Sequence, residues 1–425
     1  MKRILLIPII CLLALTGYAQ LNNSWIDYNK TYFKFKLAKD TLSRITQPTL
    51  AAAGLANVPA ENFQLWRNGK EVRMFTSVPT GLLGTNDYLE FWGLMNDGKP
   101  DNPLYLDPTT QMSDKYSLET DTVTYFLTVN TTSTNLRYTS AVNNTAGNSL
   151  PADNYFMNRI EVNYNNIINR GFASVLLTTY VFSSAYDKGE GWTSGDIAPC
   201  CPLSKTITNL NFYAAGPPNS IMYTVTAVGN ALNAREIVSR ISGVVVSQRP
   251  MPFFNYIKDT IRNLPLSLIV NPEAVNISVG SISSEPTDRL VVSCMSLTYP
   301  ATFNFNNSKN FYFELGAKAA GNFLVITNFN TNNIPPVLYD YNNSRRIIGD
   351  ISTPGQVKYA LAPSLDSIRK FNLMSLDGSN INLVNTLTSK TFTNFANTAN
   401  QGDYIIISNP VLYNDGSGVN NVDLY

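Results

Sequence analysis

Short runs in which apolar and polar side chains alternate recur along the chain, and this period of two residues is typical of strands with one buried face. Phe33, Phe35 and Leu37 alternate with a tyrosine and two lysines. Residues 122–129 place two valines, a tyrosine and a leucine on one face, and threonines with one phenylalanine on the other. Both runs therefore predict half-buried strands.

A hairpin and a short helix are predicted between these two strands. Asn68-Gly69 separates two alternating runs, and this dipeptide is the strongest local signal for a tight β-hairpin. The alanine-rich residues 49–54 predict a short helix that ends near Gly54. Residues 20–150 are thus predicted to form a compact N-terminal β module.

Beyond this module the chain is expected to remain mainly β. Residues 140–154 are polar and marked by glycine and proline, which predicts a boundary. Many short strands separated by turn residues follow, and they favour an antiparallel β-sandwich, jelly-roll-like, within residues 151–402. The hairpin expected at 337–351 and the strands after it either edge this sandwich or form a connecting sheet. The other predicted strands are 173–182, 204–215, 220–230, 264–270, 275–282, 289–300, 310–317 and 322–329.

Residues 403–425 have a different pattern. Ile405, Ile406 and Ile407 form a continuous apolar run closed by turn-forming residues, as in a strand buried on both faces of a parallel sheet. A parallel partner strand requires a crossover connection, which is usually a helix. We therefore expect this segment to be the first strand of an α/β domain that is truncated soon after it begins.

The start of the chain predicts a secretory signal peptide. Lys2 and Arg3 precede an apolar core that is too short to span a bilayer comfortably, and small residues follow at the expected cleavage site. Removal of residues 1–19 would leave an exported protein, outside the cell, in the periplasm or at the outer-membrane surface. Because Cys11 lies inside the apolar core, no lipoprotein anchor is expected, and no later segment reaches transmembrane length.

Net charge and the absence of histidine exclude several classes of function. The 425 residues have a formal net charge of +1 and no long basic run, so nothing favours nucleic-acid binding. Without histidine, the chain cannot assemble a serine triad, a Cys–His dyad or most transition-metal sites in their usual form. We assign no catalytic, cofactor-binding or metal-binding residue and expect no cofactor.

Two groups of carboxylates are candidate exceptions to this conclusion. Asp187 and Glu190 lie among glycines, which predicts a tight turn rather than an acid–base pair. Asp97, Asp101 and Asp107 are a candidate cluster for a hard cation such as calcium. Their spacing is not that of an EF-hand, so a loop built on proline and glycine is the favoured interpretation.

The cysteines of an exported chain lie in an oxidising compartment. Cys200, Cys201 and Cys294 remain after signal removal, so at most one internal disulfide leaves one free thiol. Because adjacent cysteines rarely bond to each other, we expect Cys294 to pair with one of the other two. No histidine or basic cluster lies nearby in sequence to lower a thiol pKa, so neither a redox nor a nucleophilic role is expected.

Several stretches, taken together and in this order, resemble the N-terminal half of gingipain-type cysteine peptidases, specifically the type IX secretion system sortases of Bacteroidota (PorU-like). They are NFQLWRNGKEV (62–72), DYLEFWGLMNDGKPDNPLYLDP (87–108), KYSLETDTVTYFLTVN (115–130), YDKGEGWTS (186–194), LTYPATFNFNNS (297–308), PVLYDYNNSRRIIGD (336–350) and the final 403–425.

This resemblance implies that residues 403–425 open the caspase-like α/β peptidase domain of the family. In that domain a His–Cys dyad cleaves peptide bonds, and neither member has a matching position in this chain. The chain then corresponds to the non-catalytic part of an enzyme that removes C-terminal secretion signals from cargo proteins. Its implied partners are cargo, components of the secretion system and the enzyme's own peptidase domain.

Two other hypotheses remain open at this stage. One is a secreted interaction or adhesion module that never had a catalytic domain, which the polar, aromatic-rich β composition favours. The other is a carbohydrate-binding or glycosidase-like sandwich, which rests on the carboxylates and the aromatic residues alone.

Overall fold

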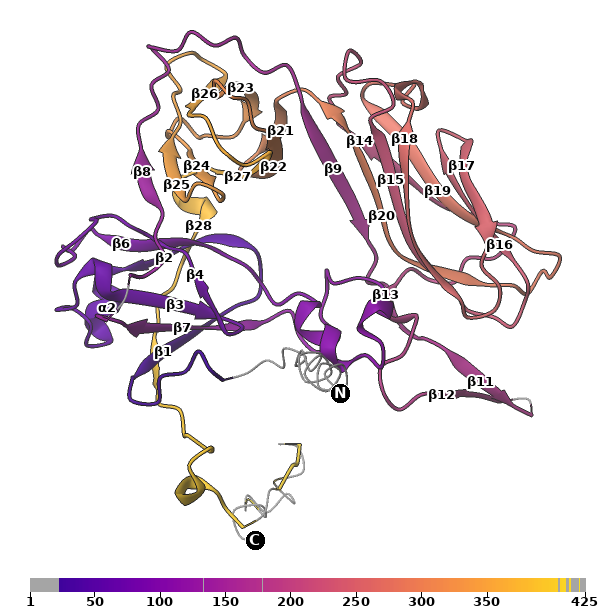
Figure 1. Ribbon diagram of the computed structural model, residues 1–425, viewed down its shortest axis with the longest axis horizontal. Coiled ribbons are helices and arrows are strands. Elements are labelled where there is room, and N and C mark those ends of the chain that lie inside the picture. Colours follow the sequence, from indigo (N-terminus) through magenta and orange to yellow (C-terminus); the bar gives the residue numbers. More distant parts are fainter. Residues whose placement is uncertain are drawn as a thin grey trace, which may run out of the picture.

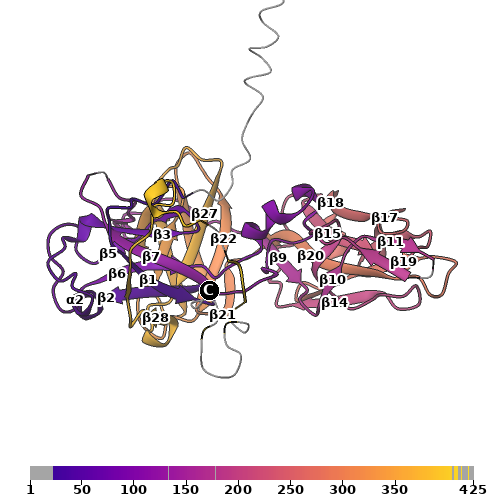
Figure 2. The same ribbon diagram turned by 90° about the horizontal axis from the view of Figure 1, so that it is seen from below.

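The computed structural model describes residues 23–132, 134–177, 179–403, 406–409, 413 and 420. Its main strands form three β modules, which we call the N-terminal module, the large sandwich and the small sandwich (Figure 1). Seen from below, the N-terminal module and the small sandwich lie together on one side and the large sandwich lies on the other (Figure 2). The prediction of a mainly β chain with a small N-terminal module and an antiparallel sandwich is confirmed.

The N-terminal module consists of two sheets, with strand orders β29-β1-β7-β3-β4 and β28-β2-β6-β5. Phe35, Phe91 and Tyr125 meet in its core, because the alternating strands turn their apolar faces inward. Its elements are β1 (Tyr32–Leu37), β2 (Thr41–Thr46), α2 (Gln47–Ala52), η1 (Ala60–Asn62), β3 (Phe63–Arg67), β4 (Lys70–Val72), β5 (Phe75–Thr76), β6 (Tyr88–Gly93), β7 (Val123–Val129), β28 (Ile381–Leu383) and β29 (Thr388–Lys390).

The local predictions for this module hold. Asn68 and Gly69 both have positive φ, 48° and 73°, and they connect β3 to β4 in a tight hairpin. The short helix α2 ends at Ala52, and Gly54 follows with φ of 80°.

The large sandwich consists of two antiparallel sheets, with strand orders β14-β19-β16-β17 and β18-β15-β20-β9. Tyr223, Ile277 and Leu297 are fully buried in its core. Its strands are β9 (Phe156–Asn163), β14 (Leu203–Thr208), β15 (Ile221–Gly229), β16 (Glu236–Ile241), β17 (Val244–Pro250), β18 (Tyr256–Leu264), β19 (Ala274–Ile282) and β20 (Leu290–Ala301).

Two small hairpin-like sheets extend from the large sandwich. One pairs β10 (Ile167–Arg170) with β13 (Glu190–Thr193), and the other pairs β11 (Ala173–Leu176) with β12 (Thr179–Phe182). The run 173–182 was predicted as a single strand, and this prediction is wrong. The chain reverses at Leu177, whose φ of 56° takes the backbone out of the strand conformation.

The small sandwich also has two sheets, with strand orders β21-β23-β26 and β22-β27-β24-β25-β8. The predicted hairpin at 337–351 is confirmed and belongs here as β24 and β25. The strands are β8 (Thr139–Ala141), β21 (Asn304–Ser308), β22 (Asn310–Gly316), β23 (Asn322–Phe329), β24 (Val337–Asp340), β25 (Arg345–Ile348), β26 (Gln356–Leu361) and β27 (Ile368–Met374).

Other differences from the sequence-based picture concern residues 264–270 and the boundaries between modules. Pro265 precedes the 3₁₀ turn η4 (Leu266–Leu268) in place of the predicted strand, and proline lacks the N–H that a central strand needs. The strand pairing also crosses the boundary expected near residue 150. β8 precedes it but joins the small sandwich, whereas β28 and β29 return to the N-terminal module.

Each module contacts the other two. Phe156 at the start of β9 packs against Phe303, Phe305, Phe311 and Phe313, which joins the large sandwich to the small one. A buried apolar cluster joins the N-terminal module to the small sandwich; it contains Leu42, Tyr138, Val337, Tyr339 and Met374.

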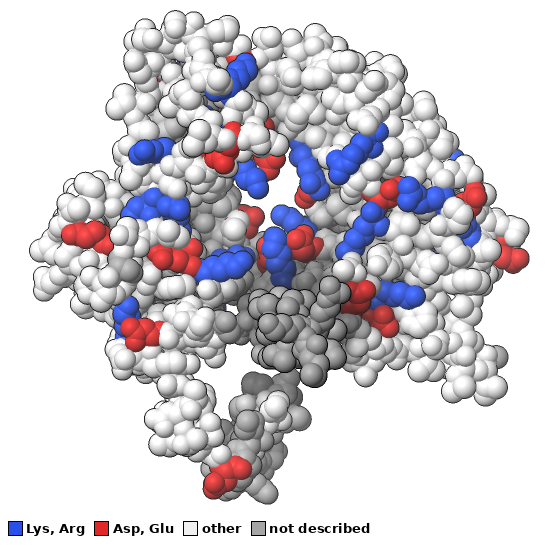
Figure 3. Space-filling model, viewed as in Figure 1, with Lys and Arg blue, Asp and Glu red and all other residues white. Residues whose placement is uncertain are grey.

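The loop between β6 and β7 joins the N-terminal module to the large sandwich. It contains the 3₁₀ turns η2 (Lys99–Leu104) and η3 (Pro108–Thr110). The hydroxyl of Tyr105 donates to the carbonyl of Glu190 at 2.9 Å, and the indole N–H of Trp192 donates to the carbonyl of Ser117 at 2.9 Å. The space-filling view shows a hollow between the three modules, with acidic and basic side chains gathered around it (Figure 3).

Two predictions fall wholly or partly outside the described residues. Residues 1–19, the predicted signal peptide, lie outside them, as does most of the segment 403–425. Ile406 and Ile407 are described; they are exposed and lie in none of the described strands. The described helices are all too short or too polar to cross a membrane.

Candidate functional site

A cleft of about 750 Å³ lies between the large and small sandwiches. One wall comes from β9, β20 and the start of β15, and the other wall comes from β22 and β27. Met157, Met222 and Ile368 contribute apolar surface to these walls. The phenylalanine cluster around Phe156 packs the two walls against each other. The cleft is therefore formed by the junction between the large and small sandwiches.

The polar groups of this cleft are paired within each wall. Arg159 and Glu161 are two residues apart on β9, so they share a face, and their side chains form an ion pair at 2.7 Å. On β22 the hydroxyl of Tyr312 donates to Glu314 at 2.8 Å. Burial and the neighbouring Glu314 carboxylate raise the pKa of Tyr312. The cleft thus combines apolar side chains with polar groups that already bind each other.

A second exposed feature is the β11–β12 hairpin, which projects from the large sandwich (Figure 1). Its apolar side chains are unusually accessible: Leu176 is 66% exposed and Leu177 is 93% exposed. Val175, Tyr180 and Val181 are each nearly half exposed. Val175 and Tyr180 are paired and share one face of the hairpin, whereas Leu176 and Val181 lie on the other face. Exposed apolar side chains on a strand pair with free edges are typical of a protein-docking site.

The structure does not bring the candidate calcium residues together. Asp101 is buried and accepts hydrogen bonds from Ser117 Oγ at 3.2 Å and from the Leu118 N–H at 2.8 Å. Asp97 pairs with Lys99 at 2.6 Å. No group of three or more His, Cys, Asp or Glu residues in the described ranges is placed to hold a metal ion.

Asp107, the third of these residues, acts at the start of η3. It accepts hydrogen bonds from the backbone N–H and the hydroxyl of Thr109, at 2.9 and 2.8 Å. These hydrogen bonds lower the pKa of Asp107. The carboxylates of this loop therefore hold the loop in shape, and the loop in turn contacts the large sandwich.

Asp187 and Glu190 form the predicted turn. The Glu190 N–H donates to the Asp187 carbonyl at 3.1 Å, and Gly189 and Gly191 adopt positive φ of 78° and 136°. Burial raises the pKa of Glu190. Tyr105 contacts the same turn through the carbonyl of Glu190, so the turn forms part of the junction with the N-terminal module.

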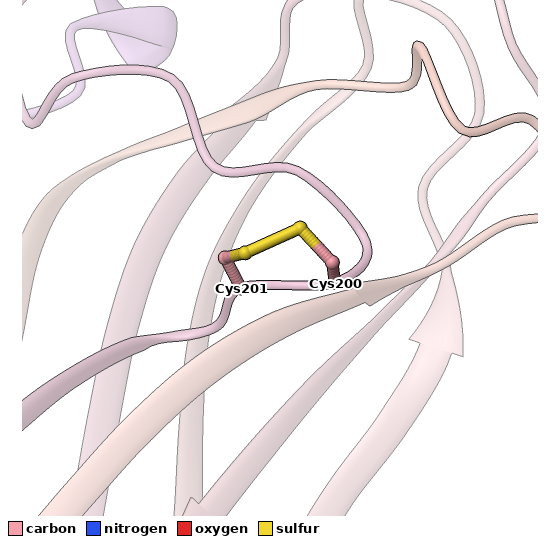
Figure 4. Close-up of a disulfide and its surroundings, with 2 residues drawn as sticks. All are labelled: Cys200 and Cys201. Carbon is pink, nitrogen blue, oxygen red and sulfur yellow. A yellow bond between two sulfur atoms is a disulfide. The ribbon is translucent and has the colours of Figure 1, made fainter.

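The disulfide prediction is wrong. Cys200 and Cys201 bond to each other in the loop before β14 (Figure 4). Cys294 is a free thiol. Cys294 lies within β20, where it pairs across strands with Thr226 and Asn163, whereas the two bonded cysteines lie in a loop. Burial raises the pKa of the Cys294 thiol to about 12, which is the opposite of an activated nucleophile.

Sequence reasoning did not single out the cleft residues or the accessible hairpin. The only local indication of these cleft residues is that polar side chains lie two positions apart on a strand, as in Arg159 with Glu161 and Tyr312 with Glu314. The same pattern is found on ordinary solvent-facing strand edges. That these two strands face each other across a cleft depends on long-range packing, which local periodicity does not reveal.

Strand pairing and junctions together define a multi-module, mainly β protein in which three sandwich-like units pack in a closed arrangement. No protein-family profile and no curated protein sequence matches the chain. Among solved structures, it is similar to dimeric latent PorU from Porphyromonas gingivalis, with 10% identity and a TM-score of 0.49. That match covers 85% of this chain and 33% of the PorU chain, so this chain spans about a third of its length.

Smaller likenesses involve sugar-binding modules. The carbohydrate-binding module CBM36, solved with calcium and xylotriose, is 14% identical, with a TM-score of 0.21 over 32% of this chain and 98% of that one. The sugar-binding C-terminal domain of EclA is 12% identical, with a TM-score of 0.17 over 36% of this chain and 86% of that one. At these identities and TM-scores, none of the likenesses supports an inference about function.

Proposed function

We propose that this chain is the N-terminal, non-catalytic part of a secreted gingipain-like cysteine peptidase of the type IX sortase kind. In this role the three modules form a scaffold outside the cytoplasm. The scaffold holds a peptidase domain in position and binds the proteins on which that domain acts, which by the family resemblance are cargo proteins with C-terminal secretion signals.

The observation that carries this proposal is the location, in the structure, of the stretches that resemble the peptidase family. Glu119 in the stretch 115–130 accepts a hydrogen bond from Tyr186 in 186–194 at 2.8 Å. Glu90 in 87–108 accepts one from Tyr339 in 336–350 at 2.6 Å. The stretch 297–308 supplies Phe303 and Phe305 to the phenylalanine cluster. The residues on which the resemblance rests therefore include the residues that join the modules.

A scaffold of this kind also requires a surface for other proteins. The β11–β12 hairpin offers accessible apolar side chains, with Leu176 and Leu177 the most exposed. The same hairpin supports the second candidate, a secreted interaction or adhesion module without a catalytic domain, since docking through apolar strands does not require a peptidase.

A thiol-directed, substrate-like probe tests the proposal. The purified chain is treated with the probe in parallel with the product of the reading frame extended beyond codon 425. We expect labelling of the extended product only, because Cys294 is partly buried and its pKa is raised. The labelled cysteine should lie beyond residue 425 and depend on a histidine in the same extension.

Two results would overturn the proposal. A reading frame that ends at codon 425, with no histidine or cysteine encoded in an adjoining exportable segment, favours the interaction module instead. Probe labelling or peptide hydrolysis by the purified chain alone, lost on Cys294→Ala substitution, would place chemistry within these modules and contradict their assignment as non-catalytic.

A further inference from the structure

A groove of about 510 Å³ runs along β1 of the N-terminal module. One wall is β1 with the turn that follows it, from Lys34 to Thr41. The other wall is the segment from Asn382 to Thr388, which passes from β28 in one sheet to β29 in the other. The groove is distinct from the cleft between the two sandwiches and from the accessible hairpin.

Three lysines, Lys34, Lys36 and Lys39, line this groove, and all three are solvent-exposed. Within the described ranges, none of them forms an ion pair or a side-chain hydrogen bond with an acidic residue. The adjacent Asp40 directs its carboxylate to the N–H of Met95 at 2.9 Å. The groove therefore carries positive charge that the protein's own carboxylates leave unbalanced.

The groove also exposes part of a strand edge. β29 pairs with β1 only at Tyr32, Phe33 and Lys34, whereas β7 pairs with β1 along its other side as far as Leu37. From Phe35 to Leu37, no described strand covers the β29 side of β1. An uncovered strand edge is a template for an added strand, because its N–H and C=O groups face outward.

The lysines are arranged for an extended ligand. Lys34 and Lys36 are two residues apart on one strand, so their side chains leave the same face, about 6–7 Å apart. The intervening Phe35 points into the core and is only 7% exposed. Thr388 of β29 already lies opposite Lys34. A strand added beside residues 35–37 would therefore place a side chain opposite Lys36, and that side chain would lie diagonally from Lys34, within reach of a long side chain.

We propose that this groove binds an extended acidic peptide segment, which adds a strand beside residues 35–37 of β1 and places a carboxylate opposite Lys36 and diagonally from Lys34. Lys39 lies at the end of the groove, where it meets a second carboxylate or the peptide's own terminal carboxylate. This site is independent of the proposed peptidase function, because it requires neither a peptidase domain nor cargo cleavage.

The test uses the full described chain and a synthetic ten-residue peptide with glutamate at alternate positions among threonine and valine. Fluorescence anisotropy measures binding at low and high salt. We expect saturable binding that weakens by about tenfold or more at high salt, since exposed charge pairs are screened. A peptide with glutamine in place of glutamate should bind far more weakly.

Matched variants locate the site. Lys34→Gln with Lys36→Gln should weaken binding by at least about fivefold, in keeping with the loss of two exposed charge pairs. Lys205→Gln with Lys370→Gln removes the same charge from exposed positions in the other two modules and should leave binding unchanged. Equal weakening by both pairs would overturn the proposal, as would no weakening by the first.

A modified peptide separates strand addition from simple charge attraction. N-methylation of alternate residues on the edge that faces β1 removes the main-chain donors and leaves the carboxylates in place. We expect this peptide to bind at least about tenfold more weakly, because several main-chain hydrogen bonds are lost together. Unchanged binding, or equally tight binding of inorganic polyphosphate that depends on the same lysines, would contradict peptide recognition at this edge.

Discussion

Arg346 on β25 donates a hydrogen bond from Nε to Oε1 of Glu90 on β6 at 3.0 Å, although the two residues are 256 positions apart in the chain. Arg44 binds the other carboxylate oxygen at 2.7 Å, and Tyr339 donates to Oε1 at 2.6 Å. Glu90 is completely buried. One carboxylate thus joins the N-terminal module to the small sandwich inside their junction.

Glu90→Gln should strongly destabilise this junction. The substitution keeps the shape of the side chain but leaves Arg44 and Arg346 without their counter-charge. Breaking a buried ion pair by removing one partner lowers the free energy of unfolding by about 3–5 kcal/mol. Urea unfolding measures the change. Glu161→Gln is the control, because its pair with Arg159 is half-exposed and contributes at most about 1 kcal/mol. Similar losses for both variants would contradict this account.

Phe156→Ala should loosen the large sandwich from the small one. Phe156 is 3% exposed and contacts four other phenylalanines, so its loss leaves a cavity at the junction. Removal of a buried phenylalanine side chain costs about 3–5 kcal/mol. Thermal unfolding and limited proteolysis between the sandwiches report the effect. Phe395 is 64% exposed, so Phe395→Ala should change neither the melting temperature nor the rate of proteolysis. A comparable effect of Phe395→Ala would contradict the role of Phe156 in joining the two sandwiches.

Cys294 should be unreactive while the protein is folded. Burial raises the pKa of its thiol from 9.0 to about 12, so the thiolate is scarce near neutral pH. With residues 1–19 removed, Ellman's reagent should detect no rapidly reacting thiol in the folded chain and one thiol after unfolding. Rapid reaction in the folded state would show that the thiol is accessible.

The same shift predicts a stability change at alkaline pH. The folded pKa is raised, so the contribution of Cys294 is fully present below pH 9.0 and is lost as the pH rises toward about 12. Between about pH 8 and 10, the melting temperature of Cys294→Ala should therefore fall less than the melting temperature of the parent chain. Parallel declines would contradict the raised pKa.

Asp350 should stabilise the small sandwich above pH 4 and lose this effect in acid. The Thr145 hydroxyl and the Ser352 N–H donate to its carboxylate and lower its pKa from 3.8 to about 2. A lowered pKa means that the contribution is complete above the ordinary value and disappears as the pH falls through about 2.

Thr145→Val tests this by removing the hydroxyl donor. The variant should melt at a lower temperature than the parent at neutral pH, and the difference should shrink as the pH approaches about 2, where Asp350 becomes protonated in both. Thr145→Ser keeps the hydroxyl and should behave like the parent. A difference that does not depend on pH would point to lost packing of the threonine instead.

Local features of the N-terminal module were predictable from sequence. The Asn68-Gly69 turn and the alternation of residues 122–129 are properties of neighbouring residues, and the structure has both. Turn chemistry and side-chain period act over a few positions, so a single sequence contains enough information for them.

Long-range pairing was not predictable in the same way. The return of β28 and β29 to the first strands, and the joining of β8 to β25, depend on which strand edges meet after hundreds of residues. The disulfide prediction failed for the same reason, because the position of β20, which contains Cys294, relative to the loop that contains Cys200 is a long-range property. The lysine groove also exists only because residues 382–388 pass beside β1.

The return of β28 and β29 determines when the N-terminal module becomes complete. Ribosomes and export channels release a chain from its first residue onward, so β1 and β2 emerge long before the strands that flank them. Val384, between those late strands, is part of the buried core, and Trp25 packs against Phe392 at 5.6 Å. The first module to be made is therefore the last to close, and until residue 392 has emerged it remains an incomplete pair of sheets with exposed edges that a holding chaperone would recognise.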